Sequence, residues 1–467
     1  MALHPSIDQD SPPSMNDHPF LWLFLIILSL NLLRLPKQKW FKNLFAHKKA
    51  RNNASDKPSA MHPGTPNKCP ACRAALLKGT PAPIECPHTI IIPWPQAKGK
   101  GGPKKTISTD GFFCPNAACT YFGDSNPATH AIAGDGKNAS NHGPIQDLSC
   151  QACQTKFSAR RHTPLYRLKS DPVVVCQILA LLANGDDPST LADIFNISEA
   201  TIRTWLSRSG DHAGKFHDLF FVNLELSHLQ FDELWGYLKR AKDNIWIWTV
   251  LDAKTKIMPV LLLGPRTQDM ANAVVHKTKS CLKPGCVPVF SSDGLRFYYY
   301  ALTAHYGEWV KLVDRLKSVW LPLANLFYAQ VIKHQRARRT VEVEQRNLWG
   351  SPDEYQSRLK VAGLSGKINT AFVERANLTI RQCVSKLTRR TWGPAHYVTE
   401  LREHLEWWRT YYQFVRNHES LRIELSEPIP RKGKLLPIKY RSIAPTMAAG
   451  LTRRRWSVLE IVSYPLL

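Results

Sequence analysis

Residues 228–235 read His-Leu-Gln-Phe-Asp-Glu-Leu-Trp, inside a longer run from Leu224 to Leu238 that is rich in apolar and aromatic side chains. Two more such runs follow, from Ile245 to Leu251 and from Lys256 to Leu263, and short polar turns separate the three. Apolar runs bounded by turn residues are typical of β-strands. Their close succession predicts a three-stranded antiparallel meander.

Beyond the meander, helical and strand-like patterns alternate. We expect a helix from about Thr267 to Ser280, a strand from Val287 to Phe290 and a helix that starts near Leu295. A later strand-like run, Leu326 to Arg336, is expected at the edge of the sheet. A meander followed by this alternation predicts a mixed α/β core of the ribonuclease H type.

Three acidic residues stand at the ends of apolar segments in this core. Asp232 would lie on the first strand and Asp293 just past the fourth, which are neighbours in such a fold. Glu374 falls in a helix expected over Ala371–Leu387, and Arg381 lies two turns later on the same face. Divalent cations need hard oxygen ligands on rigid elements. We therefore expect the three acids to bind two Mg²⁺ or Mn²⁺ ions, and Arg381 to hold a phosphate.

A single Asp at a strand end is usually a turn former or a surface charge. Three acids in this order, each in a matching local context, favour the catalytic interpretation instead. Glu233, next to Asp232, is expected to point to the opposite side of the strand and to be solvated or structural.

The composition favours a polyanionic partner. The chain has 467 residues, 43% of them hydrophobic, which predicts roughly two to four domains with at least one large core. Its 62 Lys and Arg against 37 Asp and Glu give a formal net charge of +25. Such a protein accumulates on polyanions and releases their counterions. Nucleic acid is the expected partner, although an anionic membrane would also attract this charge.

Seven of the eleven cysteines lie between residues 69 and 153, six of them in closely spaced pairs. This spacing predicts metal-binding knuckles in a reducing compartment rather than disulfides. Two pairs would supply the tetrahedral thiolate ligands of a zinc ribbon. These ligands are Cys114, Cys119, Cys150 and Cys153. An earlier group could close a second zinc site or stay unliganded, and its members are Cys69, Cys72, Cys86 and His88.

Between the cysteines and the meander, the pattern predicts helices joined by tight turns. An apolar helix over 173–182 is followed by a second over 188–195, which has proline in its first turn. Ser198 is a good N-cap for a third, from Glu199 to Leu206. The last two predict a helix-turn-helix that binds double-stranded DNA, with a helical hairpin that never touches DNA as the alternative. The base-contacting residues would be Ala200, Thr201, Arg203 and Thr204.

Residues 20–33 form an apolar run that Ser29 and Asn31 interrupt and basic residues follow. A helix that crosses a bilayer needs about 20 apolar residues. The run could lie in the membrane interface, span a thinned bilayer or pack as a leader. A membrane tether here would leave the remainder in the cytoplasm. Otherwise we expect a cytoplasmic, nucleoid-associated protein.

The order of these features resembles a known family. The zinc ribbon and helix-turn-helix are followed by Phe-Asp-Glu-Leu-Trp at 231–235, Ser-Asp-Gly-Leu at 292–295 and Val-Glu-Arg-Ala-Asn-Leu-Thr-Ile-Arg at 373–381. Over about residues 110–425 this resembles the bacterial insertion-sequence transposases of the DDE type, closest to the insertion-sequence-one group. The long stretch 306–366 and the apolar leader depart from the family pattern.

The resemblance implies a catalytic triad of Asp232, Asp293 and Glu374, with Arg381 as the basic residue that follows the glutamate. It implies cleavage of phosphodiester bonds at element ends and transfer of the freed 3′-hydroxyl to target DNA. Synapsis of two ends implies a homodimer or a larger assembly. Two alternatives remain: a transposase-derived DNA-binding protein that does not cut, and a membrane-tethered zinc-binding regulator.

The expected organisation is multidomain α/β. It comprises an apolar leader and basic linker (1–67), a zinc-ribbon region (68–168), a helix-turn-helix domain (169–215), a ribonuclease H-like catalytic domain (224–425) and a basic C-terminal tail (426–467). Most aromatic rings over 407–414 are expected to pack the closing helix against the sheet, leaving Arg409 and Arg416 for the DNA backbone.

Overall fold

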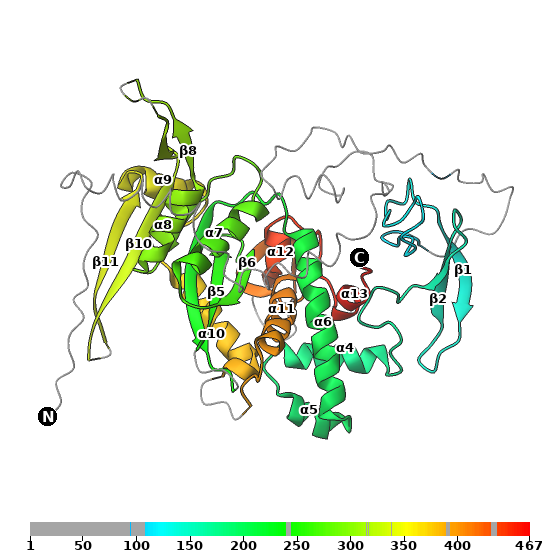
Figure 1. The fold of residues 1–467 in the computed structure, drawn as a ribbon. Helices are drawn as coiled ribbons and strands as arrows, with labels where there is room; N and C mark the ends of the chain where they lie inside the picture. Colours follow the sequence, from blue (N-terminus) through cyan, green and yellow to red (C-terminus); the bar gives the residue numbers. More distant parts are fainter. Residues whose placement is uncertain are drawn as a thin grey trace. The chain divides into compact units, whose positions relative to one another are not determined.

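The computed structural model describes Trp94 and residues 108–467, with gaps at 240–243, 314, 316, 338, 389–392 and 431–436. This part of the chain has a mixed α/β fold with ten α-helices and four sheets (Figure 1). None of these helices combines the length and apolar character that crossing a membrane requires. The apolar run at 20–33 and the earlier cysteine and histidine group lie outside the described residues.

The cysteine region folds around a small antiparallel sheet in the order β1-β2-β3. Its strands are β1 (Ile132–Asn138), β2 (Ile145–Cys150) and β3 (Lys156–Ser158). The core of this region is a handful of buried side chains, among them Ile132, Leu148 and Phe157. A core this small contributes little free energy of folding, so a further crosslink such as a metal ion would matter here.

Three helices follow: α4 (Pro172–Leu182), α5 (Pro188–Phe195) and α6 (Glu199–Phe220). Ser198 acts as the N-cap that the sequence predicts, since its side chain accepts from the Thr201 N–H. Asn196 ends α5 at a left-handed φ of 50°. However, α6 continues well past Leu206. Its apolar face continues to Phe216, and Gly210 lets its backbone approach α11 closely.

The main sheet has six strands in the order β11-β10-β7-β4-β5-β6. The predicted meander is confirmed, because β4 (His228–Gly236), β5 (Ile245–Asp252) and β6 (Val260–Gly264) pair antiparallel in succession. Next to β4 lies β7 (Val289–Ser292), in parallel pairing. Two strands complete the sheet, β10 (Phe327–Arg336), parallel to β7, and β11 (Arg339–Trp349), antiparallel to β10. The prediction of an edge strand at 326–336 is therefore wrong, since β11 covers its outer side.

Both faces of the central strands are buried, as their alternating side chains show. Trp248 belongs to the hydrophobic cluster that includes helices α7 (Gln268–Cys281) and α8 (Arg296–His305). Its neighbour Ile247 belongs to the cluster formed with α10 (Ala371–Cys383) and α11 (Val398–Phe414). The predicted helix at 371–387 thus ends four residues early and continues as a 3₁₀ turn, Ser385–Leu387.

The long stretch 306–366 is largely structured. It contains the hairpin β8 (Gly307–Val310) and β9 (Val319–Pro322), the strands β10 and β11, and helix α9 (Pro352–Val361). The aromatic rings of α11 pack as predicted, with Trp407, Trp408 and Phe414 almost fully buried. Arg409 is buried beside Glu406, which corrects the expectation that it faces the DNA backbone.

The C-terminal segment is folded, which corrects its interpretation as a basic tail. The ribbon β12 (His418–Ile429) and β13 (Ile438–Ile443) precedes helices α12 (Pro445–Ala448) and α13 (Val458–Val462). Ile461 and Val462 are fully buried, in the same hydrophobic cluster as α4, α6 and the sheet residue Phe231. The three arginines at 453–455 indicate a solvated segment in the sequence, so the short apolar helix α13 is not predicted. The predicted helix-turn-helix and catalytic regions therefore share one core.

Candidate metal centres

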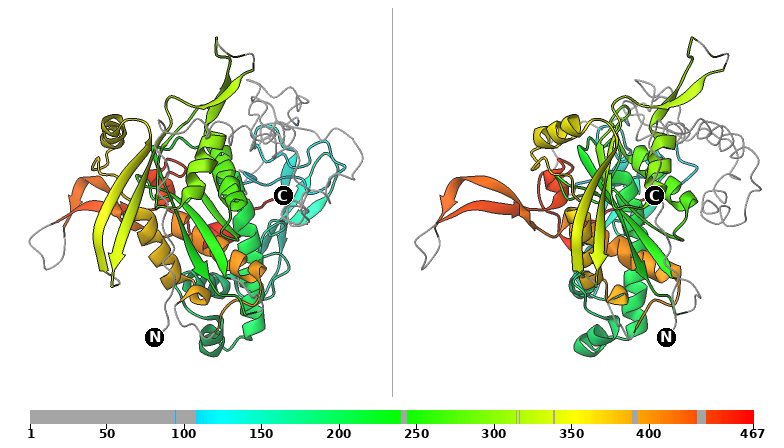
Figure 2. Two further views of the ribbon diagram at one scale, coloured as in Figure 1. Left: turned by 60° about the vertical axis from the view of Figure 1, so that its left-hand side comes forward. Right: turned by 90° about the vertical axis from the view of Figure 1, so that its left-hand side faces the viewer.

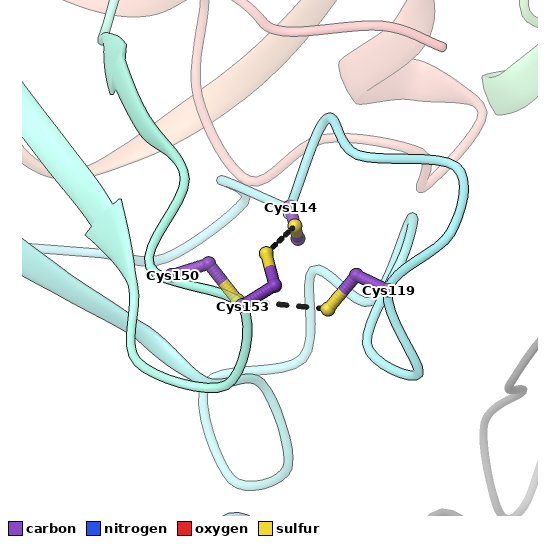
Figure 3. A group of neighbouring side chains, drawn as sticks. All are labelled: Cys114, Cys119, Cys150 and Cys153. Atoms are coloured by element: carbon purple, nitrogen blue, oxygen red, sulfur yellow. Dashed lines mark hydrogen bonds between the residues drawn. The ribbon is translucent and has the colours of Figure 1, made fainter.

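Four cysteine thiols converge from two loops (Figure 3). Cys114 and Cys119 lie in the loop before β1, while Cys150 ends β2 and Cys153 lies in the turn to β3. The Sγ atoms of Cys114 and Cys153 are 3.5 Å apart, and those of Cys119 and Cys150 are 3.8 Å apart. Thiolates around a tetrahedral zinc ion, with bonds of about 2.3 Å, lie about 3.8 Å from one another. The cluster could therefore hold a zinc ion.

Local backbone geometry explains why the thiols converge. Gln154 has a left-handed φ of 58°, so the chain turns sharply and its N–H bonds to the Cys150 carbonyl at 2.8 Å. The Gly123 N–H likewise bonds to the Cys114 carbonyl at 3.3 Å, which closes the first loop. All four cysteines are free, as metal ligands must be.

Burial raises the pKa of the Cys119 thiol to about 11 and raises that of Cys114 further. For Cys153, hydrogen bonds with Thr155 outweigh burial and lower the pKa to about 6. One thiolate is thus available near neutral pH, whereas a metal ion must displace protons from at least two others. Metal affinity at this cluster should rise with pH.

A second group of ligand atoms lies where β4 and β7 run side by side. The parallel pairing of Phe231 with Ser292 brings the next two residues side by side: Asp232, in the middle of β4, and Asp293, just past the end of β7. Carboxylate oxygens of Asp232, Glu233 and Asp293 all lie within 4.8 Å of one another. The structure thus brings together two of the three predicted acids and adds Glu233.

Each carboxylate of this acidic group is fixed by neighbours. Asp232 accepts hydrogen bonds from the Glu233 N–H at 2.9 Å and from the Asn377 amide at 2.8 Å. Asp293 accepts from the Leu295 N–H at 3.0 Å, just before α8. Rigid placement of this kind is what a metal site requires.

The pKa values of all three carboxylates are raised, because the groups are buried and lie near other acidic charges. Burial, and then the charges of Asp293 and Glu233, raise the pKa of Asp232 to about 7. Burial and the charge of Asp293 also raise the pKa of Glu233, and burial raises that of Asp293. A bound cation would relieve this repulsion and favour the ionised carboxylates.

Glu233 fits the structural one of the two roles that the sequence allowed for it. It is not solvated, since its side chain is 2% exposed and forms an ion pair with Arg266 at 2.6 Å. The Tyr298 hydroxyl also donates to it, at 3.2 Å. Glu233 does lie on the other face of the strand from Asp232, among the side chains next to α8. Both still reach Asp293, because Asp293 follows the end of the neighbouring strand.

Glu374 lies near this acidic group but outside it. Asn377, one helical turn after Glu374, donates to Asp232. The charge of Glu374 contributes to the raised pKa of Asp293. The Glu374 oxygens accept hydrogen bonds from Lys333 of β10 and from the Thr370 hydroxyl. A hollow of about 330 Å³ opens beside it, lined among others by Lys333, Lys367 and Thr370.

Arg381 lies one helical turn from Asn377 on α10. Its guanidinium donates to the Trp235 carbonyl at 3.0 Å and lies over the Trp235 ring. Its role in holding a phosphate remains a prediction. Asn377, Lys333 and Arg266 are site residues that sequence reasoning missed. Asn377 offered a signal, because it lies three residues after Glu374 on the helix surface.

The four residues proposed to meet DNA lie at the start of α6. Ala200, Arg203 and Thr204 are exposed, and Thr201 is half-buried beside Ser198. Arg203 forms an ion pair with Glu199 one turn earlier. An exposed pair of this kind is weak, so Arg203 can exchange it for a phosphate or base.

No protein-family model matches this chain, and no curated protein matches it either.

Proposed function

We propose that this protein is a DDE-type transposase with a ribonuclease H-like core, which cleaves DNA strands at insertion-sequence ends and transfers them to target DNA. The convergence of the Asp232, Glu233 and Asp293 carboxylates, where β7 ends beside the middle of the parallel strand β4, carries the proposal. Acids at this position, with a further glutamate from a helix on the sheet, suit a site for two divalent cations.

Asp232 and Asp293 would hold two Mg²⁺ or Mn²⁺ ions, and Glu374 would complete the ligand shell. When bound, the ions would activate the attacking water or 3′-hydroxyl and stabilise the leaving oxygen in an in-line displacement. Asn377 keeps Asp232 oriented toward Asp293 through its 2.8 Å hydrogen bond. Arg266 offsets part of the negative charge by holding Glu233.

Lys333 has two roles in this proposal. Before DNA binds, it neutralises Glu374, the acid that lies outside the acidic group. When an ion and a phosphate arrive, Glu374 can turn to the ion and Lys333 to the phosphate. The hollow beside both residues leaves room for this exchange.

Delivery to DNA would use other parts of the chain. The start of α6 would contact bases, Zn²⁺ at the four cysteines would be the structural ion, and the net charge of +25 would attract the DNA backbone. Two element ends must meet, so at least two copies would act together. Such a protein would work on the nucleoid in the cytoplasm, with a membrane tether through 20–33 as the alternative.

The test is strand cleavage of labelled DNA that carries the terminal repeats flanking the gene. Purified protein with Mg²⁺ or Mn²⁺ should nick or cut these ends, and the Asp232→Ala variant should not. Asp269→Asn, which changes an exposed acid in the first turn of α7, is the matched control and should cut normally. No cleavage by wild type under any of these conditions would refute the proposal.

One observation favours a second candidate, a transposase-derived protein that binds DNA without cutting it. Glu374 is paired with Lys333 and stands outside the acidic group. If that pair is permanent, the site lacks its third ligand. Specific binding to the terminal repeats without cleavage would support this candidate.

A further inference from the structure

The ribbon of β12 and β13 has a free edge. The two strands form a two-stranded sheet that is regular at Arg422–Glu424 and shifts in register on either side of these residues. In the described part of the chain, β12 has a strand neighbour on one side only. Figure 2 shows them in orange-red as a long twisted ribbon. Most of their side chains are exposed, including Ile423, Ile429 and Tyr440. An isolated ribbon is marginally stable in water, and an unpaired edge is a template for another strand.

The sequence of β12 is symmetric about Ile423. Residues 419–427 read Glu-Ser-Leu-Arg-Ile-Glu-Leu-Ser-Glu, which is the same in both directions apart from the exchange of Arg422 and Glu424. Two such strands, placed antiparallel about a two-fold axis at Ile423, put Arg422 of each opposite Glu424 of the other. A two-fold interface demands this kind of self-complementarity.

We propose that β12 pairs antiparallel with β12 of a second copy of this chain, which makes a continuous sheet β13-β12-β12-β13 across the dimer. Main-chain hydrogen bonds along the two edges would supply affinity, as in other cases of strand addition. The exposed Ile423 of both copies would meet on one face at the axis, whereas Leu421 is already buried in its own chain and Leu425 is half-buried. The Arg422–Glu424 pairs lie on the other face.

Other registers of this pairing are unfavourable, because they place like charges opposite each other or apolar side chains opposite polar ones. Centring the two-fold axis on Arg422 puts two arginines opposite each other, and centring it on Glu424 does the same with two glutamates. A shift by one residue pairs apolar side chains with polar ones. The Ile423 register leaves one unfavourable contact, Glu419 against Glu427 of the second copy, at the solvent-exposed ends of the pairing.

This inference does not rest on the proposed enzymatic function. It uses none of the residues of the acidic group, and a dimer could form in a protein that never cuts DNA. Its failure would leave the cleavage experiment untouched.

The first test is a cysteine crosslink in the full-length chain. Directly opposed residues in an antiparallel pair have Cα atoms about 4.5–5.5 Å apart, within the range of a disulfide. Ile423→Cys should therefore form a covalent dimer under mild oxidation, seen on a non-reducing gel. Ser426→Cys, exposed on the same strand, would lie far from its own copy and should crosslink no more than wild type. Equal crosslinking at both positions, or at neither, would overturn the inference.

The second test is a charge exchange followed by light scattering of the eluted protein. Wild type should be a dimer. Glu424→Arg places two Arg–Arg pairs across the axis and should weaken dimerisation about tenfold or more. The double variant R422E/E424R restores opposite charges and should regain the dimer. A monomeric wild type, or a double variant as weak as the single, would overturn the inference.

A third measurement separates dimerisation from DNA binding, since the ribbon also carries basic residues such as Lys439 and Arg441. If Glu424→Arg changed only the affinity for DNA and left the oligomeric state unaltered, the ribbon would be a DNA contact and the dimer assignment would fail. Circular dichroism of each variant checks that the fold is retained.

Discussion

Replacing Asp232 by asparagine removes one charge from the acidic group while keeping the size of the side chain. Burial, and then the charges of Asp293 and Glu233, raise the pKa of Asp232 from 3.8 to about 7. Keeping it ionised at pH 8 therefore costs the folded protein roughly 4 kcal/mol relative to the unfolded chain. Because the folded pKa is the higher one, this cost is absent below about pH 4, grows as the pH rises and is complete above pH 7.

Asp232→Asn removes this cost and so stabilises the folded protein, but the loss of a hydrogen bond offsets part of that stabilisation. Asp232 accepts from both the Glu233 N–H and the Asn377 amide, whereas an asparagine has one oxygen and must present its NH₂ group to one of these donors. The lost hydrogen bond costs about 1 kcal/mol. Without divalent cations at the acidic group, Asp232→Asn should therefore be roughly 2–3 kcal/mol more stable than wild type at pH 8. At pH 5 the difference should fall below about 1 kcal/mol.

The assay is urea unfolding followed by tryptophan fluorescence, at pH 5 and pH 8. The buffer should be freed of Mg²⁺ and Mn²⁺ without a chelator that would strip the cysteine cluster. Added Mg²⁺ should stabilise wild type at pH 8 and much less at pH 5, and it should hardly affect Asp232→Asn. Asp269→Asn should behave as wild type throughout.

Two results would refute the reasoning. If Asp232→Asn were less stable than wild type at pH 8 without cations, burial and the neighbouring charges would not destabilise the ionised Asp232 carboxylate as inferred. If Mg²⁺ stabilised both proteins equally, the ions would bind elsewhere.

Three further predictions concern other parts of the chain. Cys150→Ser should abolish zinc binding at the cysteine cluster, measured as bound metal per chain and as protease sensitivity of residues 108–168, while Cys176→Ser should keep both as in wild type. Gly210→Ala would put a Cβ 2.2 Å from a carbonyl oxygen of α11 and should destabilise the fold by about 1–3 kcal/mol in urea unfolding. Gly214→Ala, four residues on, meets nothing closer than 3.8 Å and should stabilise α6 by about 0.5–1 kcal/mol; equal effects at the two glycines would contradict the close packing of the helices. Arg203→Ala should weaken binding to double-stranded DNA by about 1–3 kcal/mol and lower its salt dependence, whereas unchanged affinity would exclude the start of α6 as the contact.

Local patterns determined much of the fold. The apolar runs and turns predict β4, β5 and β6 in their antiparallel order, because strand alternation and turn chemistry act over a few residues. Pro188 and Asn196 likewise specify where α5 begins and ends, and Ser198 specifies where α6 begins, through capping hydrogen bonds and a left-handed turn. Each closely spaced cysteine pair lies on one short loop, so the sequence predicts that two such pairs bind one metal ion together.

Contacts between distant segments decided the remainder. The burial of α13 could not be read from a segment that follows three arginines, since its apolar face becomes visible only against α4 and α6. The close packing of α6 depends on Gly210, whose missing side chain matters because the α11 backbone lies against it.

The same distinction between local sequence and tertiary contacts applies to the candidate site. The sequence by itself determined which carboxylates are available, that Asp232 lies on a strand and that Asp293 follows one. Only the tertiary structure decided that β4 and β7 are parallel neighbours, that Glu233 joins the group from the other face, and that Lys333 holds Glu374. The physical reason is that hydrogen bonding of a strand or helix is set locally, whereas the charge around a carboxylate depends on which elements pack beside it.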